Sequence, residues 1–191
     1  MFAIRRPLSI TTTSALVIAF SAMIFGGAQA SAEAMDKVSV DNLQAAIRTL
    51  SFLESLPTEG TIMVGVVFPS DLPGAQAAAE ATGQLIGTLH GPNSRTLRPV
   101  LISTDALAQF DGHLDVLFLM AGASRHSAAI LDTMRRRRLV SLSDDPSCGD
   151  TGCCVVLVGT GQRVEISLNT ALADAVGARF SLVFTMVVKR K

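Results

Sequence analysis

An uninterrupted apolar run, TIMVGVVF at residues 61–68, sets the strongest limit on the fold of this chain. A strand with one face in water alternates apolar and polar residues, and this run shows no such alternation. A continuous run of this length is typical of a strand that is buried on both faces, as in a parallel sheet covered by helices. The run therefore favours an α/β fold and predicts helical segments on either side of it.

Helical and strand patterns alternate along the rest of the chain. Residues 41–56 repeat apolar side chains at helical spacing and predict a helix that Asp41 caps and Pro57 ends. The further expected elements are a helix at 75–89, a strand at 98–103, a short helix at 104–110, a strand at 114–120, a helix at 124–137, strands at 139–143, 154–159 and 163–168, and a last helix from Asn169 almost to the end. Only the turn TGQ separates the last two strands, which predicts an antiparallel hairpin. We therefore expect one α/β domain: a three-layer sandwich with a mainly parallel sheet, a C-terminal β-hairpin and a closing helix.

The first thirty residues have the pattern of a signal peptide. Arg5 and Arg6 precede an apolar run at 14–25, and small residues in a small-x-small arrangement lead up to Ala30. The apolar run is shorter than the about 20 residues that a membrane-spanning helix needs. We therefore expect cleavage after Ala30, export of the chain, and a single mature domain over residues 31–191.

The charge and the aromatic content argue against a nucleic-acid partner. The sequence has 16 basic and 16 acidic residues. The expected leader contains two arginines and no acid, so the mature chain has a net charge of −2. Trp and Tyr are absent. Nucleic-acid-binding domains normally carry a basic patch and aromatic side chains that stack on bases, and this chain predicts neither.

The sequence lacks the common motifs for cofactors, metals and catalysis. The first strand-to-helix turn holds one glycine, Gly74, where dinucleotide binding needs three. Cys153 and Cys154 are adjacent and would point to opposite faces of a strand, so their loop offers a metal at most two thiolates. There is no Gly-x-Ser-x-Gly elbow and no Cys-x-x-Cys at a helix start. We therefore expect no catalytic residue, no metal and no cofactor.

All three cysteines lie in one short segment, SDDPSCGDTGCCVVLVGTG, at residues 143–161. Cysteines this close together in an exported chain are expected to form a disulfide. Cys148 can reach either Cys153 or Cys154 across the glycine-containing turn, and the spacing leaves that choice open. Either bond leaves one thiol over, and closing so small a loop contributes about 2 kcal/mol.

The last expected helix has a broad apolar stripe. Its members are Phe180, Leu182, Val183, Phe184, Met186, Val187 and Val188. Most of the stripe is expected to be core. The remainder, for which Phe180, Phe184 and Met186 are the candidates, is expected to form a partner surface.

Several of these segments resemble the YfiR-like periplasmic proteins, over nearly the whole mature chain. Residues 43–57, 61–68 and 139–158 are similar to the first helix, the first strand and the cysteine-containing loop of that family. The most diagnostic stretch is similar too, because Asn169 follows the final strand and Gly177 interrupts an alanine-rich helix. Two departures are a Leu-Pro where the family's first helix usually ends in Trp-Pro, and fewer basic residues in the last helix.

The resemblance implies both a location and a role. It implies a periplasmic α/β sandwich in which Cys148 pairs with Cys154 and Cys153 is a spare thiol. It also implies a regulator rather than an enzyme. Such a regulator would bind the periplasmic sensor region of a membrane protein, a diguanylate cyclase, and repress it in a redox-sensitive way. A homodimer is a further partner that the sequence leaves open.

The alternative hypothesis is a periplasmic small-anion sensor or carrier. Ligands of open α/β sheets bind outside the carboxyl ends of the strands. Here that edge would be formed by the loops at 69–74, 103–106 and 121–127. Arg125 and the backbone amides at the start of its helix are the predicted anion donors.

Overall fold

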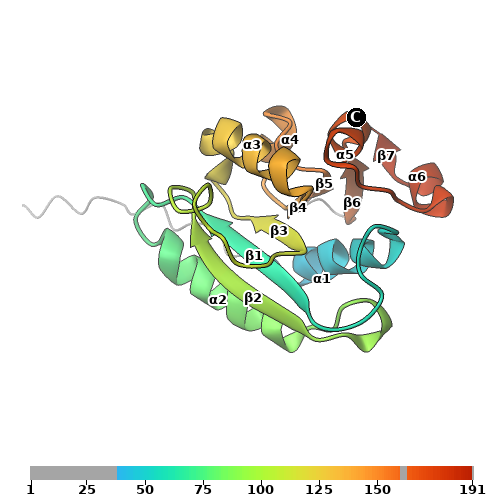
Figure 1. The fold of residues 1–191 in the computed structure, drawn as a ribbon, viewed down its shortest axis with the longest axis horizontal. Coiled ribbons are helices and arrows are strands. Elements are labelled where there is room, and N and C mark those ends of the chain that lie inside the picture. The colour runs from blue at the N-terminus through green and yellow to red at the C-terminus, as the bar shows by residue number, and fades with distance from the viewer. Residues whose placement is uncertain (1–37, 160–162, 191) are drawn as a thin grey trace, which may run out of the picture. The chain divides into compact units, whose positions relative to one another are not determined.

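The computed structural model describes residues 38–159 and 163–190 (Figure 1). The expected leader and the TGQ turn lie outside the described residues. The strands form one sheet in the order β2-β1-β3-β4-β5-β6-β7. They are β1 (Ile62–Phe68), β2 (Leu97–Ser103), β3 (Val116–Leu119), β4 (Val140–Ser143), β5 (Val156–Gly159), β6 (Glu165–Leu168) and β7 (Lys189–Arg190).

The sheet is mainly parallel. Strands β1 to β5 run in the same direction, and β6 is antiparallel to β5, with Val156 opposite Leu168. The predicted C-terminal hairpin is therefore confirmed. Side chains on both faces of β1 are buried, as its apolar run predicts.

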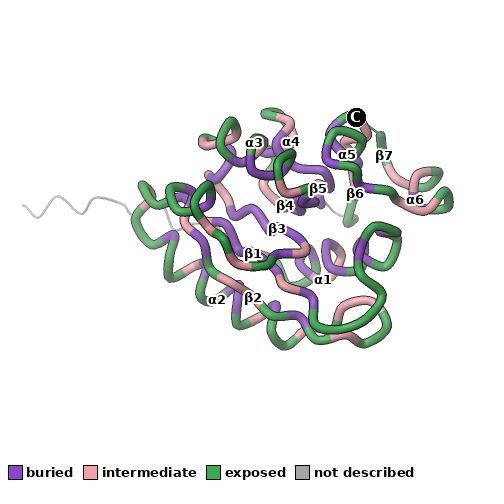
Figure 2. Tube along the Cα trace, viewed as in Figure 1, coloured by how far each residue is buried: buried purple, intermediate pink, exposed green. Residues whose placement is uncertain are grey.

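Helices cover both faces of the sheet. They are α1 (Val40–Thr49), α2 (Ala75–Thr88), α3 (Ser127–Arg137), α4 (Pro146–Asp150), α5 (Thr170–Val176) and α6 (Leu182–Val187), with 3₁₀ turns η1 (Leu50–Phe52), η2 (Pro92–Ser94) and η3 (Ala123–His126). The connection from β1 to β2 through α2 leads toward one edge of the sheet. The connection from β3 to β4 through α3 leads toward the other edge. Such crossovers are right-handed, so these two helices lie on opposite faces. The predicted sandwich is confirmed, and Figure 2 shows the buried residues concentrated along its strands and on one side of its helices. No helix among residues 38–159 and 163–190 is long and apolar enough to span a membrane.

The first helix starts earlier and ends sooner than predicted. It is preceded by Ser39 rather than Asp41, and helical geometry stops before Leu53. Leu53 is extended and pairs with Phe180 in an isolated antiparallel bridge. This long-range pairing competes with the helix and explains why the apolar spacing overestimates the helix length.

The prediction of one continuous helix from Asn169 almost to the end is wrong, because this range holds two short helices, α5 and α6. Gly177 adopts a left-handed conformation with φ 72° and ends α5. The next residues run extended, because Arg179 O accepts a hydrogen bond from Glu54 N (2.8 Å) and Ser181 N donates to Phe52 O (2.9 Å). The chain then forms α6, and β7 adds to the edge of β6.

Two shorter segments also differ from prediction. Residues 104–110 form turns instead of a short helix, held by local bonds such as Gln109 N to Ala106 O at 3.1 Å. The cysteine loop contains an additional helix, α4, where only a loop was expected. Its cap, Asp145, accepts a hydrogen bond from Ser147 N at 3.0 Å, and Pro146 is its first residue. An Asp-Pro pair is a common helix start, so the signal was present in the sequence.

Candidate functional site

The disulfide of the cysteine loop joins Cys148 to Cys153, whose Cα atoms are 5.3 Å apart. A left-handed turn at Gly152 reverses the chain after α4, and Cys153 N donates to Cys148 O at 3.0 Å. The pairing of Cys148 with Cys154, which the family resemblance implied, is therefore wrong. Neighbouring residues of an extended chain point in opposite directions, so only one of the two can face Cys148. Cys154 is buried in the hydrophobic core.

Hydrogen bonds tie this loop to the carboxyl end of the sheet. Asp145 Oδ2 accepts from Gly122 N at 3.0 Å, and the hydroxyls of Ser124 and Ser147 share a hydrogen bond of 2.7 Å. On the other side, Ser141 Oγ donates to Cys153 O at 3.0 Å. The disulfide thus closes a loop that is anchored both to β4 and to the turn before α3.

The anion site predicted at this edge is occupied by the protein's own carboxylates. Arg125 forms a salt bridge with Asp71 at 3.2 Å, and His126 lies 3.5 Å from the same carboxylate. The backbone amide of Gly122, at the start of η3, donates to Asp145. The sequence located these donors correctly, but it did not show that acids from distant segments reach them.

The residues predicted as a partner surface do not share one face. Phe184 is 2 % exposed, and its ring stacks on Phe52 at 5.0 Å and on Phe180 at 5.2 Å between centroids. Met186, two residues later, is 72 % exposed. The prediction that most of the stripe is core is wrong, because Leu182, Val183 and Val187 are exposed as well. Helix α6 has only six residues and packs against the domain through Phe184. Its other apolar side chains are left exposed.

A groove lies between α1 and β6, next to this aromatic stack. Its volume is about 630 Å³. The residues that line it are Asp41, Gln44, Ala45, Arg48, Thr49, Phe52, Val164 and Ile166. Phe52 and Val164 are exposed apolar side chains within it. The groove is not predictable from local sequence patterns, because its two walls are more than a hundred residues apart in the chain.

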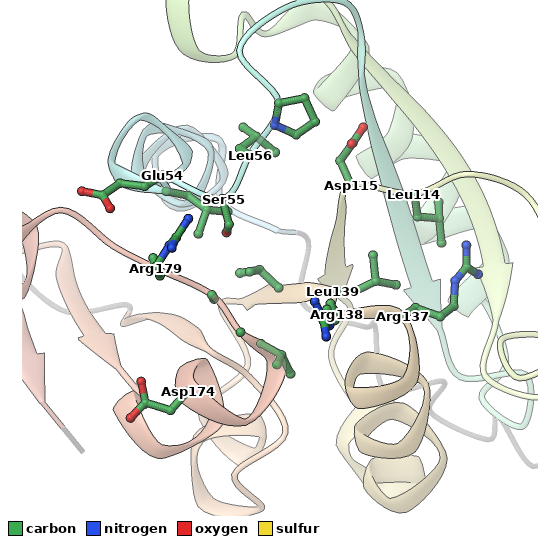
Figure 3. A pocket seen from close by; sticks show the side chains of 16 residues that line it. Glu54, Ser55, Leu56, Leu114, Asp115, Arg137, Arg138, Leu139, Asp174 and Arg179 are labelled. Carbon is green, nitrogen blue, oxygen red and sulfur yellow. The ribbon is translucent and has the colours of Figure 1, made fainter.

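A larger cavity of about 810 Å³ lies near the amino ends of β3 and β4, opposite the predicted ligand edge (Figure 3). Arg137, Arg138 and Arg179 line it. Arg137 is used structurally, since it donates to Phe110 O at 2.7 Å and to Gly112 O. Among the described residues, neither Arg138 nor Arg179 forms a salt bridge. Two guanidinium groups therefore remain available to a ligand in this cavity.

The two family-motif positions both define the ends of α5. Asn169 Oδ1 accepts a hydrogen bond from Leu172 N at 3.0 Å, and Asn169 N donates to Val155 O at 2.8 Å. Asn169 thus caps the helix and joins it to the sheet. Gly177 ends the same helix, at a left-handed position that other residues adopt with strain.

A family model identifies the protein family to which this chain belongs. The model described as YfiR/HmsC-like matches residues 55–183, which is more than half of the chain. The chain belongs to the YfiR/HmsC-like family. The matched residues of this YfiR/HmsC-like protein include the cysteine loop, the cavity arginines and the first two residues of α6. The resemblance found in the sequence is confirmed.

Solved structures share the fold at very low identity. The ABC domain in complex with L-Trp from Streptococcus pneumonia has a TM-score of 0.57, covering 78 % of this chain and 60 % of its own. A ligand-free, open substrate-binding protein with adhesive properties from Clostridium difficile scores 0.53, with 68 % and 54 % covered. A conserved domain protein from Vibrio cholerae scores 0.56, with 80 % and 60 % covered. Each is 9 % identical to the YfiR/HmsC-like chain, so the likeness concerns the fold alone. The chain spans between about half and three fifths of their length, and no curated protein matches it.

Proposed function

We propose that this protein is a periplasmic regulator that binds the periplasmic region of a membrane receptor, a diguanylate cyclase, and represses it. The observation that carries the proposal is the match of residues 55–183 to the YfiR/HmsC-like family. The signal-peptide pattern of the first thirty residues supports the location. The receptor would then be repressed by contact with a folded protein rather than by a chemical reaction.

The groove between α1 and β6 is the proposed receptor contact. Phe52 and Val164 supply an apolar centre, and Asp41 and Arg48 supply charges beside it. An apolar centre with a polar rim is typical of protein interfaces. Phe184 stacks on Phe52 and holds that ring in place. Of the predicted partner residues, Phe180 and Phe184 thus support the surface from below, whereas Met186 lies apart on the exposed side of α6.

Cellular cyclic-di-GMP measures the proposed repression. Deletion of the gene is expected to raise the cyclic-di-GMP level, because the cyclase loses its repressor, and wild-type protein is expected to restore the low level. Val164→Lys places a charge in the apolar centre of the groove and is expected to fail to restore it. Leu101→Lys changes an exposed apolar side chain on β2, at the opposite edge of the sheet, and serves as the matched control.

Two results would contradict these proposals separately. An unchanged cyclic-di-GMP level after deletion would remove the repressor function. A rise that Val164→Lys reverses as well as wild type would leave the function intact but exclude the groove as the contact.

A second candidate function, a small-anion sensor, is favoured by the cavity that Arg138 and Arg179 line. The acids Glu54, Asp115 and Asp174 line the same cavity. In Figure 3 the carboxylates of Glu54 and Asp174 point away from Arg138. Two guanidinium groups suit a carboxylate or phosphate group, which accepts paired hydrogen bonds from arginine. The proposed anion site is therefore at the amino ends of the strands, and not at the edge that the sequence predicted.

Calorimetric titration with inorganic phosphate and with acetate tests this candidate. Arg179→Gln is expected to weaken binding of the better anion by roughly tenfold, because one charge-assisted hydrogen bond is lost. Arg135→Gln removes an exposed charge outside the cavity and should leave the affinity unchanged. Absence of any heat with either anion, or an equal loss in both variants, would count against the site.

A further inference from the structure

The exposed side of α6 is an apolar surface with no cover in the structure. It consists of Leu182, Val183, Met186 and Val187, with exposed fractions between 66 % and 76 %. These are the four most exposed of the large apolar side chains in the described residues. Exposed apolar side chains that gather in one place usually mark a contact with another molecule or a membrane. We refer to these four residues as the α6 surface.

Positive charge adjoins the α6 surface. Lys189 and Arg190 begin two residues after Val187, and Lys191 follows them in the sequence. Residues 175–191 contain four basic and no acidic residues. Lys189 and Arg190 are exposed, and neither takes part in a salt bridge within the described residues. The apolar surface and these cations are therefore close neighbours along the chain.

We propose that α6 and β7 bind the surface of a membrane that contains anionic phospholipid. Apolar side chains of an interfacial helix enter about 5–10 Å into the boundary between headgroups and acyl chains. Lysine and arginine beside such a helix keep their charged ends at the level of the lipid phosphates. The α6 surface supplies the first contact, and Lys189 and Arg190 supply the second.

A second copy of the chain fits this surface poorly. In a symmetric dimer the same patch faces itself, which would place the cations of both chains close together. One helix of six residues also falls well short of the roughly 800 Å² per partner that a stable protein interface buries. A lipid surface needs no matching shape, and its phosphates balance the cations.

The inner side of α6 explains why the surface stays outside. Phe184 is held in the stack with Phe52 and Phe180, so the helix cannot rotate its other residues into the core without losing that packing. The side chains of the α6 surface therefore stay exposed to solvent. This inference goes beyond the proposed repression and does not depend on which protein the regulator binds.

Cosedimentation with vesicles tests the proposal, using protein purified in its exported form. One set of vesicles is pure phosphatidylcholine, and the other contains equal parts of phosphatidylcholine and phosphatidylglycerol. Wild type is expected to bind only the second set, and less at high salt. Lys189→Gln and Arg190→Gln should each weaken binding by roughly fivefold. Leu182→Gln with Met186→Gln should weaken it at constant charge.

Matched controls use exposed residues elsewhere. Arg135→Gln removes one charge from the arginine run of α3, and Leu101→Gln removes one exposed apolar side chain from β2. Both should bind as wild type does. All variants are compared by circular dichroism, so that loss of folding is recognised.

Several results would overturn the inference. These are no binding to either vesicle, equal binding to both, an unchanged affinity after Leu182→Gln with Met186→Gln, or an equal loss with Arg135→Gln. A dimer in sedimentation that Leu182→Gln with Met186→Gln dissociates would assign the surface to a second copy instead. Binding of an acidic protein without binding of vesicles would assign it to a protein partner. None of these results alters the cyclic-di-GMP experiment, so the two proposals fail independently.

Discussion

Phe184→Ala is expected to lower the free energy of unfolding by about 3–5 kcal/mol. The side chain is buried, and its ring stacks on both Phe52 and Phe180. The substitution leaves a cavity between η1 and the segment before α6, and it removes the contact that holds these two parts together. Because the chain has no Trp or Tyr, denaturant unfolding is best followed by far-ultraviolet circular dichroism.

Met186→Ala is the matched control for this substitution. It removes a side chain of similar size from the same helix, but from a position that is mostly in water. Its expected effect is within about 0.5 kcal/mol of zero. Equal destabilisation by the two substitutions would mean that α6 packs differently, with both sides against the core.

The fold was largely predictable because its strands can be recognised from local residue patterns. The run at 61–68 is apolar on both faces and forms the buried strand β1. The hairpin of β5 and β6 was predictable from the shortness of its turn alone. These features depend on residues that are close in sequence, and a pattern can report them.

The end of the domain was not predictable in the same way. Phe184 and Met186 both belong to the apolar stripe that the sequence shows. Only Phe184 stacks on Phe52, which lies more than 130 residues earlier in the chain. The backbone hydrogen bonds of Arg179 with Glu54 and of Ser181 with Phe52 also involve that distant part of the chain. No helical spacing contains this information, so most of the stripe was assigned to the core and the buried Phe184 was grouped with the exposed Met186 as a partner surface.

The candidate sites show the same division. The local sequence identified the cysteine loop but left the partner of Cys148 open, and the resemblance then chose Cys154 incorrectly. The predicted anion donors exist, yet Asp71 and Asp145 reach them from other segments. The groove and the arginine cavity both assemble from distant elements. Residue chemistry was therefore readable from the sequence, whereas the pairing of residues across the fold was not.

Loss of the disulfide is the second large effect that the structure predicts. Cys153→Ala is expected to lower the free energy of unfolding by about 2 kcal/mol, because the short loop between Cys148 and Cys153 is no longer closed in the unfolded chain. A reductant should destabilise wild type by a similar amount and should leave Cys153→Ala unchanged. We propose that repression needs the closed loop, so the same variant is expected to restore low cyclic-di-GMP less well than wild type.

Cys154→Ala separates this bond from the alternative one. It removes a buried sulfur but keeps Cys148 and Cys153, so a reductant should still destabilise it by about 2 kcal/mol. Thiol titration of the unfolded, unreduced variant should detect no thiol. If instead Cys154→Ala releases two thiols and Cys153→Ala remains sensitive to reductant, the bond is Cys148–Cys154. In that case Cys154 would occupy the position that faces Cys148, and the strand after it would shift by one residue. A shift of one residue moves every side chain of β5 to the opposite face of the sheet. The burial of Val156 and Val158 on one face argues against that arrangement.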